Sequence, residues 1–350
     1  MFEAVVAQAQ ILRSLGATPV VLGVEDEAAS QDSWRLEGAE LHLARRRGPV
    51  ALAYAPDLPR LLEAAKLDLL HLHGIWQYPV RAADVWAGST SKPMVVSPHG
   101  MLHPWITNRN AWKKRAARLL WEREAWSRAS LLHALTEAEA VDIEREIPTA
   151  STIVIPNAAP AATREPPRPR GPVALYLGRI HEKKNLGALL AAWTRVRGDL
   201  PAESSLVIAG WGDDEGIAAL ESALACSAAP NVEFVGTAFG SQKAALLDLA
   251  RFMVLPSHSE GLPMAILEGW AAGVPSIMSD ACNLPEGFAS GAAIRCGTSS
   301  DAIGAALVEA FAKTGREWRE MSNSALALAS GPFSQETIAK HWERCYGRLL

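Results

Sequence analysis

Short apolar runs alternate with segments of helical periodicity along most of this chain. A short apolar run between turn residues is typical of a strand that is buried on both faces of a sheet. Strands that alternate with helices predict an α/β fold built from doubly wound parallel sheets. The predicted strands are Thr18–Gly23, Leu41–Leu43, Leu67–His71, Met94–Ser97, Leu131–Ala134, Ile153–Ile155, Val173–Leu177, Leu206–Ala209, Val232–Val235, Phe252–Leu255, Ser276–Met278 and Ala293–Arg295.

Apolar residues three and four positions apart predict helices between these strands. Gly16 ends the first helix, since glycine is common just past a helix terminus. The helices predicted by range are Phe2–Leu15, Asp57–Ala65, Trp112–Trp126, Glu137–Glu144 and Phe333–Leu350.

A stretch rich in proline and arginine, residues 158–172, separates two similar halves of the chain. Its composition and lack of periodicity are typical of a linker. A chain of 350 residues has the length of about two domains. We therefore expect one domain over residues 1–157 and a second over residues 173–332, each with its own sheet.

The composition limits the class of protein. A formal net charge of −4 gives no reason to expect a nucleic-acid partner. The four cysteines are scattered without a CxxC pair, which favours free thiols in a reducing compartment. No apolar run approaches the ~18 residues of a transmembrane helix. We expect a cytoplasmic protein, or one that is peripheral on the inner face of the cytoplasmic membrane.

The stretch Pro256–Gly273 carries the most specific chemistry. A loop with Glu260 leads into a helix with Pro263 in its first turn, where a missing N–H is tolerated. The free amides and positive dipole end of a helix start form an anion site. Glu268 lies within the apolar run of this helix, and a buried carboxylate needs a hydrogen-bonding partner. One helix thus presents an anion cradle flanked by two carboxylates.

Residues 178–185 form a basic turn directly after a predicted strand. In open α/β sheets, ligands bind at the carboxyl ends of the strands. Arg179 and Lys184 at such an end suit a diphosphate, because arginine can bind two oxygens at once and lysine adds a compact charge. A solvated basic turn is the alternative. Lys183 is the weaker candidate of the two lysines.

Histidines follow two neighbouring strands in the first half. His99 comes just after Met94–Ser97, and Gly100 beside it permits close approach of a ligand. His71 and His73 end the preceding strand and are weaker candidates for ligand contacts. A satisfied core histidine is the alternative at each position.

The glycine turn at residues 210–216 could pass for a dinucleotide fingerprint. Three adjacent carboxylates in it would repel a pyrophosphate, so a nicotinamide enzyme is a distant alternative. No convincing Asp-x-Asp metal motif is present, and we expect neither a metal nor a cofactor.

Glu260 and Glu268 around Gly261-Leu262-Pro263 resemble the donor-site signature of family 4 glycosyltransferases, and the resemblance covers most of the chain. It implies the GT-B fold, in which two Rossmann-like domains face a cleft, and retaining transfer of a sugar from a nucleotide-diphosphate donor. The catalytic residues that it implies are His99, Glu260, Arg179 and Lys184. The donor-binding residues that it implies are Arg179, Lys184, Gly210, Gly236, Thr237, Glu260, Gly261, Leu262, Pro263, Met264 and Glu268.

Within this resemblance, the two cations bind the pyrophosphate, Glu268 accepts from the ribose hydroxyls, and His99 faces the sugar. Glu260 lies by the sugar hydroxyls, and the base rests near Gly236 and Thr237. His71, His73 and Gly100 lie on the acceptor side. A UDP-sugar is mildly preferred from family frequency alone.

The ends of the chain are also interpreted through the family. There, a strand and a glycine-rich turn precede the first helix, and neither is present before Phe2–Leu15. We expect either an upstream extension or the loss of an inner strand. The terminal helix 333–350 is expected to cross back onto the first domain.

Residues 105–128 hold four tryptophans and seven lysines or arginines against two glutamates. A basic helix with interleaved Trp suits an anionic membrane surface. A salt-bridged helix with its Trp in the core is the alternative. PHGMLHPW, residues 98–105, resembles the bacterial exopolysaccharide branch of the family, whose acceptors are often lipid-linked.

These observations favour a retaining, metal-independent hexosyltransferase that acts on a glycan or lipid-linked acceptor in cell-surface polysaccharide synthesis. A nucleotide-sugar epimerase or hydrolase of the same fold is one alternative. A donor-binding protein without activity is the other.

Overall fold

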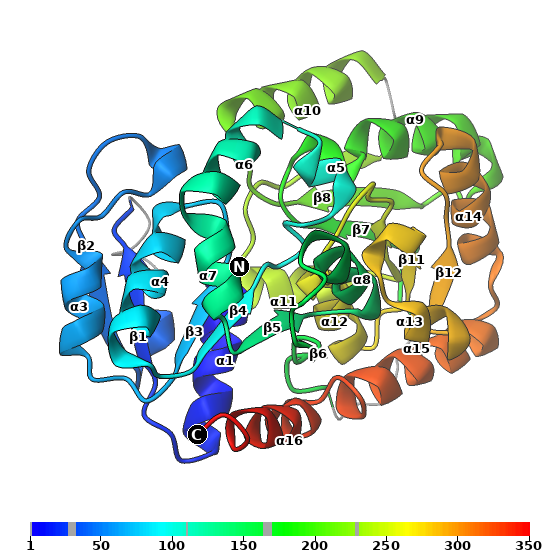
Figure 1. Ribbon diagram of the computed structural model, residues 1–350. Coiled ribbons are helices and arrows are strands. Elements are labelled where there is room, and N and C mark those ends of the chain that lie inside the picture. The colour runs from blue at the N-terminus through cyan, green and yellow to red at the C-terminus, as the bar shows by residue number, and fades with distance from the viewer. Residues whose placement is uncertain (1, 27–32, 110, 164–169, 228–230) are drawn as a thin grey trace. The chain divides into compact units, whose positions relative to one another are not determined.

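The computed structural model describes residues 2–26, 33–109, 111–163, 170–227 and 231–350. Contacts divide the chain into two compact units: Met1–Asn157 with Glu336–Leu350, called unit 1, and Ala158–Gln335, called unit 2. Strands and helices alternate within each unit (Figure 1), which confirms the predicted α/β class. Residues 164–169 of the predicted linker lie outside the described residues.

Unit 2 is built on one sheet of six parallel strands in the order β12-β11-β10-β7-β8-β9. The chain leaves β7 toward β8 on one side, and β10 continues toward β11 on the other. The strand order therefore reverses between β7 and β10, and such a switch point is where open α/β sheets bind ligands. The strands are β7 (Val173–Leu177), β8 (Ser205–Ala209), β9 (Val232–Phe234), β10 (Phe252–Leu255), β11 (Ser276–Met278) and β12 (Ala293–Arg295).

Helices connect these strands, and α9 and α14 pack side by side (Figure 1). The helix of the candidate anion cradle is α12, and it begins one residue later than expected. Pro263 is its N-cap and not part of its first turn. Gly273, with φ 69°, follows its end. The helices of unit 2 are α9 (Leu186–Val196), α10 (Asp214–Ser227), α11 (Gly240–Leu249), α12 (Met264–Ala271), α13 (Pro285–Ala289), α14 (Ser300–Ala312) and α15 (Gly315–Ser330). The 3₁₀ turns are η4 (Glu182–Lys184), η5 (Arg197–Asp199) and η6 (Asp280–Cys282).

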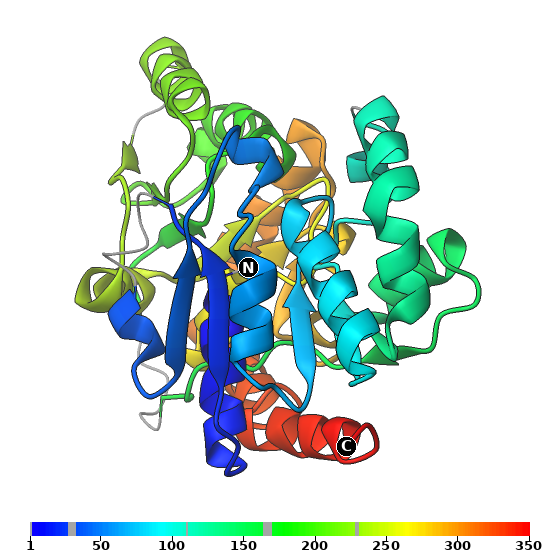
Figure 2. The same cartoon turned by 60° about the vertical axis from the view of Figure 1, so that its left-hand side comes forward.

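Unit 1 holds two parallel sheets in its described part. One has the order β3-β4-β5-β6, and the other pairs β1 with β2, which lie side by side in Figure 2. The strand predicted at Leu67–His71 starts later, so His71 lies within β3 and His73 is its last residue. The strands are β1 (Val20–Val24), β2 (Glu40–Ala44), β3 (Leu70–His73), β4 (Met94–Ser97), β5 (Leu131–Ala134) and β6 (Thr152–Val154).

The helices of unit 1 include one that periodicity did not predict, α4 (Tyr78–Thr90). Its buried residues fall on several sides, which blurs a helical stripe. The single helix predicted at Trp112–Trp126 is three segments with a π-helical turn, η3 (Arg118–Glu122), in the middle. The other elements are α1 (Phe2–Ser14), α3 (Leu58–Ala64), α5 (Pro104–Thr107), α6 (Ala111–Ala117), α7 (Arg123–Arg128), α8 (Glu137–Glu146), α16 (Gln335–Tyr346), η1 (Ser33–Leu36) and η2 (Val50–Leu52).

Three of the cysteines, Cys282, Cys296 and Cys345, are free thiols, as the sequence predicts, and all three are buried. The side chain of Cys226 lies outside the described residues. Burial raises the pKa of the Cys296 thiol to about 12, so this thiol is neutral and packs as a small apolar group.

Candidate functional site

The loops after β7 and β10 carry a buried ion pair at the switch point of unit 2. Lys184 donates from Nζ to Glu260 Oε1 over 2.6 Å, and Ser257 Oγ donates to the same oxygen over 2.6 Å. The side chains of Lys184 and Glu260 are only 12% and 6% exposed. A carboxylate so deeply buried is stable only when its charge is compensated, and this pair supplies that charge.

Two asparagines hold these loops in place. Asn185, in the left-handed region at φ 61°, donates from its side chain to the carbonyl oxygens of Pro256 and Thr298. Asn283 donates to the carbonyl oxygens of Glu260 and, at 3.2 Å, Gly261. Because both loops are fixed to neighbouring segments, Lys184 and Glu260 are positioned before any ligand binds.

Arg179 lies on the more exposed side of the same basic turn. Its guanidinium lies over the ring of Trp211, 5.4 Å from the centroid, and Nη2 is 3.4 Å from Asp213 Oδ2. Burial lowers the pKa of Lys183, and the positive charges of Lys184 and Arg179 lower it further. Three cations therefore share this end of the sheet. Trp211 and Asp213 were not among the predicted site residues.

The predicted donor residue Gly210 has a structural task. A Cβ at this position would lie 1.8 Å from the carbonyl oxygen of Gly178, so only glycine allows the two backbones to meet. The amide of Gly210 also donates to the carbonyl oxygen of Gly236, whose φ is 70°. The loops after β7, β8 and β9 are thereby joined, and Thr237 follows as an exposed residue.

Glu268 on α12 has the partner that the sequence led us to expect. Lys243 on α11 donates from Nζ to Glu268 Oε1 over 2.8 Å, and the two side chains are 25% and 12% exposed. Lys243 was missed, because nothing in the sequence indicates which cation of a distant helix would reach this carboxylate. Met264 and Ala265 begin α12, so their amides have no acceptor within the helix and form an anion-binding end, whereas the amide of Ile266 donates to the carbonyl oxygen of Pro263 at 3.1 Å.

In unit 1, His99 and Gly100 form a turn after β4. His99 has φ 54° and Gly100 has φ 75°, and a positive φ at a non-glycine residue is a strained conformation. Glu139, which sequence reasoning missed, holds this turn by accepting from the amides of Gly100 and Leu135 at 2.5 and 2.8 Å. Burial raises the pKa of the Glu139 carboxyl. A carboxylate at the third position of a helix is a capping signal that could have indicated it.

The side chain of His99 contacts His73. Its Nε2 lies 2.8 Å from His73 Nδ1, and the two rings stack with centroids 5.1 Å apart. Burial lowers the pKa of His73 to about 3 and holds the pKa of His99 well below its usual value. Both rings are therefore neutral near pH 7, and one of them donates to the other.

His71 belongs to a chain of hydrogen bonds that joins α1 and α16 to the strands of unit 1. The carbonyl oxygen of Ile155 can only accept, so the neutral ring of His133 donates to it and accepts from Ser97. Five hydrogen bonds follow one another in this network. Gln8 donates to Tyr346 over 2.8 Å, and Tyr346 donates to His71 over 2.7 Å. His71 donates to Ser97 over 2.6 Å, Ser97 to His133 over 2.6 Å, and His133 to the carbonyl oxygen of Ile155 over 2.7 Å. Both ring nitrogens of His71 are occupied, so the structure favours a structural role for it over the predicted acceptor contact.

The predicted residues thus form two groups. Unit 2 brings together the cations of the basic turn, Glu260 and the start of α12, with Glu268 further along that helix. Unit 1 brings together His73, His99 and Gly100.

Family models match both halves of the chain. Residues 3–158 match the glycosyl transferase 4-like domain, and residues 171–313 match the glycosyl transferases group 1.

Curated relatives match about half of the chain. An O-antigen chain mannosyltransferase B of Escherichia coli is 26% identical over 175 residues, which are 49% of this chain and 43% of that protein. A glycogen synthase of Mycobacterium tuberculosis is 30% identical over 182 residues, 51% of this chain and 44% of that protein. The match thus spans less than half the length of these relatives.

Solved structures share the fold over nearly the whole chain. Anabaena Alr3699/HepE in complex with UDP and glucose superposes with a TM-score of 0.82 at 16% identity, covering 99% of this chain and 96% of that chain. Sucrose-phosphate synthase from Thermosynechococcus elongatus superposes with a TM-score of 0.72 at 17% identity, covering 95% and 99%. At these identities the likeness establishes the fold.

Proposed function

Since its two halves match the glycosyl transferase 4-like domain and the glycosyl transferases group 1 on a GT-B fold, we propose that the chain is a glycosyltransferase. It moves a sugar from a nucleotide-diphosphate sugar to a hydroxyl group of an acceptor glycan or lipid-linked glycan.

The observation that carries this proposal is the charge arrangement at the switch point of unit 2. Lys184 uses one of its three N–H donors on Glu260, which leaves two for phosphate oxygens. Arg179 is half-exposed and can bind a phosphate bidentately. The first turn of α12 adds free amides beside them. A diphosphate leaving group that gains negative charge is stabilised by all three.

Glu268 binds the ribose in this proposal. Lys243 holds only one of its two carboxylate oxygens in the pairs described, and a carboxylate accepts several hydrogen bonds. Glu260 lies by the hydroxyls of the sugar, and the turn at Gly236 and Thr237 lies beside the base. UDP is our preferred nucleotide, which is supported by the UDP in the complex of Anabaena Alr3699/HepE.

The hydroxyl of the acceptor attacks the sugar from the face of the departing phosphate. The bond from the acceptor oxygen to the anomeric carbon forms as the bond to the phosphate oxygen breaks, and a phosphate oxygen takes the proton of the hydroxyl. The configuration of the sugar is then retained. Arg179, Lys184 and the start of α12 supply the positive charge for this step, so we propose that it needs no metal ion.

His99 contributes the neutral side chain from unit 1. Because burial holds its pKa well below the usual value, it acts as a hydrogen-bond donor and acceptor and not as a cation. In this proposal it contacts the sugar and its phosphate, and Gly100 and His73 lie on the acceptor side.

The acceptor belongs to cell-surface polysaccharide synthesis in this proposal. The match to an O-antigen chain mannosyltransferase supports that class, and a hexose is the sugar that fits it.

Turnover of UDP-glucose and of other nucleotide-sugars, followed by product analysis, tests the function. We expect transfer to an added glycan acceptor, with the anomeric configuration of the donor kept in the product by NMR. Free sugar as the sole product would indicate a hydrolase, and an isomerised donor would indicate an epimerase. Binding without any product would indicate an inactive donor-binding protein, and each of these three results would overturn the proposal.

A further inference from the structure

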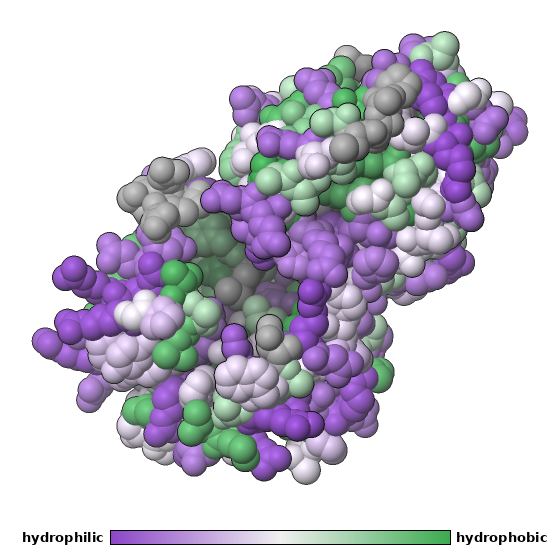
Figure 3. Space-filling view, turned by 90° about the horizontal axis from the view of Figure 1, so that it is seen from above, coloured by the Kyte–Doolittle hydropathy of each residue, from purple (hydrophilic) through white to green (hydrophobic). Residues whose placement is uncertain are grey.

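The helical segment Ala111–Arg128 of unit 1 presents large apolar side chains to solvent. Trp112, Leu119 and Leu120 are 69%, 73% and 66% exposed, and Ala116 between them is exposed as well. Positions i, i+4, i+7 and i+8 lie on one face of a helix, so these four residues form a stripe. We call it the outer stripe. On the face of the molecule seen in Figure 3, hydrophilic residues separate the apolar patches from one another.

The opposite side of the segment holds it to the unit. Ala117, Glu122, Ala125 and Trp126 are buried there, and Trp126 packs edge-on against Trp76 with centroids 5.7 Å apart. The core alternative considered for the tryptophans of this segment therefore describes Trp126, whereas Trp112 lies on the surface. Because the inner side anchors the helices, the exposed outer stripe adds little to the core of unit 1 and calls for a different explanation.

Positive charge surrounds the outer stripe. Lys113, Arg115 and Arg123 are exposed on the same segment. Of the two acids in the segment, Glu122 is buried, and burial raises its pKa to about 7, which weakens its negative charge. Glu124 is exposed, and its Oε2 lies 3.2 Å from Nη1 of Arg81. The face around the stripe is thus cationic.

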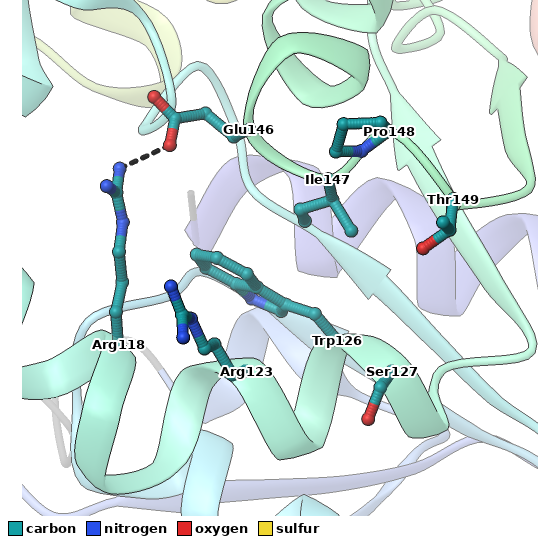
Figure 4. Close-up of a pocket in the computed structure, with 8 residues that line it drawn as sticks. All are labelled: Arg118, Arg123, Trp126, Ser127, Glu146, Ile147, Pro148 and Thr149. Atoms are coloured by element: carbon teal, nitrogen blue, oxygen red, sulfur yellow. Dashed lines mark hydrogen bonds and ion pairs between the residues drawn. The ribbon is translucent and has the colours of Figure 1, made fainter.

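A cavity of about 320 Å³ opens beside this segment. Arg118, Arg123 and Ser127 of the segment line one side, and Thr149 lies on the other (Figure 4). Arg118 is paired with Glu146, and the guanidinium of Arg123 projects along the same wall. Guanidinium and hydroxyl groups are donors that suit a phosphate.

We propose that the outer stripe and its surrounding cations form a docking face for an anionic phospholipid bilayer. Trp and Leu insert at the interface between headgroups and acyl chains, and lysine and arginine attract the headgroup phosphates. A protein partner would match the apolar stripe equally well, but the cationic rim favours an anionic lipid surface. None of the helices in the described part of the chain has the length and apolar character needed to span a bilayer.

This inference does not depend on the identity of the donor. If the acceptor is lipid-linked, the face brings unit 1 to the surface where such an acceptor resides. Failure of lipid binding would leave sugar transfer to a water-soluble acceptor unchanged, so the two proposals are tested separately.

Sedimentation with phosphatidylcholine vesicles, with or without phosphatidylglycerol, tests the face. We expect the protein to sediment with the phosphatidylglycerol vesicles, to stay in solution with phosphatidylcholine alone, and to be released by salt. Replacing Lys113, Arg115 and Arg123 by Gln together should weaken partitioning by about 100-fold. Replacing Trp112, Leu119 and Leu120 by Gln together should weaken it by at least about 10-fold.

Matched controls test whether the effect belongs to this face. Trp34→Gln removes a tryptophan that is 72% exposed elsewhere in unit 1, and it should change nothing. Replacing the exposed Arg316, Arg319 and Arg344 by Gln removes three cations of α15 and α16 and should have at most a small effect. Thermal midpoints check that each variant folds. If the apolar variant does not fold, the cation variant and the salt dependence decide.

Three outcomes would overturn the inference. The first is a wild-type protein that stays in solution with phosphatidylglycerol vesicles. The second is a cation variant that partitions as the wild type does. The third is a wild-type dimer in size-exclusion chromatography that the apolar variant abolishes, which would assign the outer stripe to contact between two copies of the chain.

Discussion

Replacing Lys184 separates the two tasks that we assign to it. In the free protein it compensates the buried charge of Glu260 over 2.6 Å, with Ser257 as the other partner. Lys184→Ala leaves a carboxylate that is 6% exposed without its cation. Breaking a buried pair in this way costs about 3 kcal/mol, which corresponds to a fall of about 6–12 °C in the melting temperature of a unit of this size.

The same substitution removes a cation from the diphosphate site. A hydrogen bond to a charged group contributes about 1.5–3 kcal/mol, so the dissociation constant of UDP-glucose should rise about 10- to 150-fold. The double variant Lys184→Ala with Glu260→Gln distinguishes the two tasks. It has no unpaired buried charge, so its melting temperature should recover most of the loss, whereas donor affinity should stay low. Calorimetric titration and thermal melting measure the two quantities.

Recovery of both quantities in the double variant would refute this reasoning, because Lys184 would then act only through Glu260. Unchanged donor affinity in Lys184→Ala would refute it as well.

Three further predictions concern the frame of the site. Gly210→Ala brings a Cβ to 1.8 Å from the carbonyl oxygen of Gly178, so the free energy of unfolding in urea should fall by about 3 kcal/mol. A variant as stable as the wild type would contradict the close approach of the two backbones. Glu139→Ala leaves two buried amides of unit 1 without an acceptor and should lower the free energy of unfolding by about 2–4 kcal/mol. Turnover should fall while donor binding to unit 2 is kept; equal losses of turnover and donor affinity would contradict the placement of Glu139 in unit 1 alone. Burial lowers the pKa of His133 to about 4, so the unfolded chain binds its proton first and stability is lost as pH falls below about 6.5. The stability difference between wild type and His133→Asn should therefore shrink by about 1.4 kcal/mol per pH unit from pH 6.5 to about 4, and a constant difference would contradict the neutral hydrogen-bond chain.

Sequence patterns predicted the strands of both units well, because a strand buried on both faces leaves a short apolar run between turns. Met94–Ser97, Phe252–Leu255 and Ser276–Met278 have the predicted bounds. The helix α4 was missed, because buried residues on several of its sides leave no clear apolar stripe. The π-helical turn at Arg118–Glu122 depends on tertiary packing and leaves no local signal.

The residues of the candidate site likewise divide into those that the sequence indicates and those that only the fold brings together. Glu268 could be recognised as a carboxylate that needs a partner, but its partner Lys243 comes from another helix and only the fold brings the two together. The sequence placed His71 at the end of a predicted strand and made it a candidate for a contact with the acceptor. In the structure it lies within β3 and uses both ring nitrogens on Tyr346 and Ser97, contacts that join segments far apart in sequence.

A crystal structure of the protein soaked with UDP would test the central claim most directly. Our account predicts diphosphate oxygens within hydrogen-bond distance of Arg179 and Lys184, the first turn of α12 beside them, and ribose hydroxyls on the carboxylate of Glu268. A nucleotide bound elsewhere on the protein, with these three side chains untouched, would contradict it.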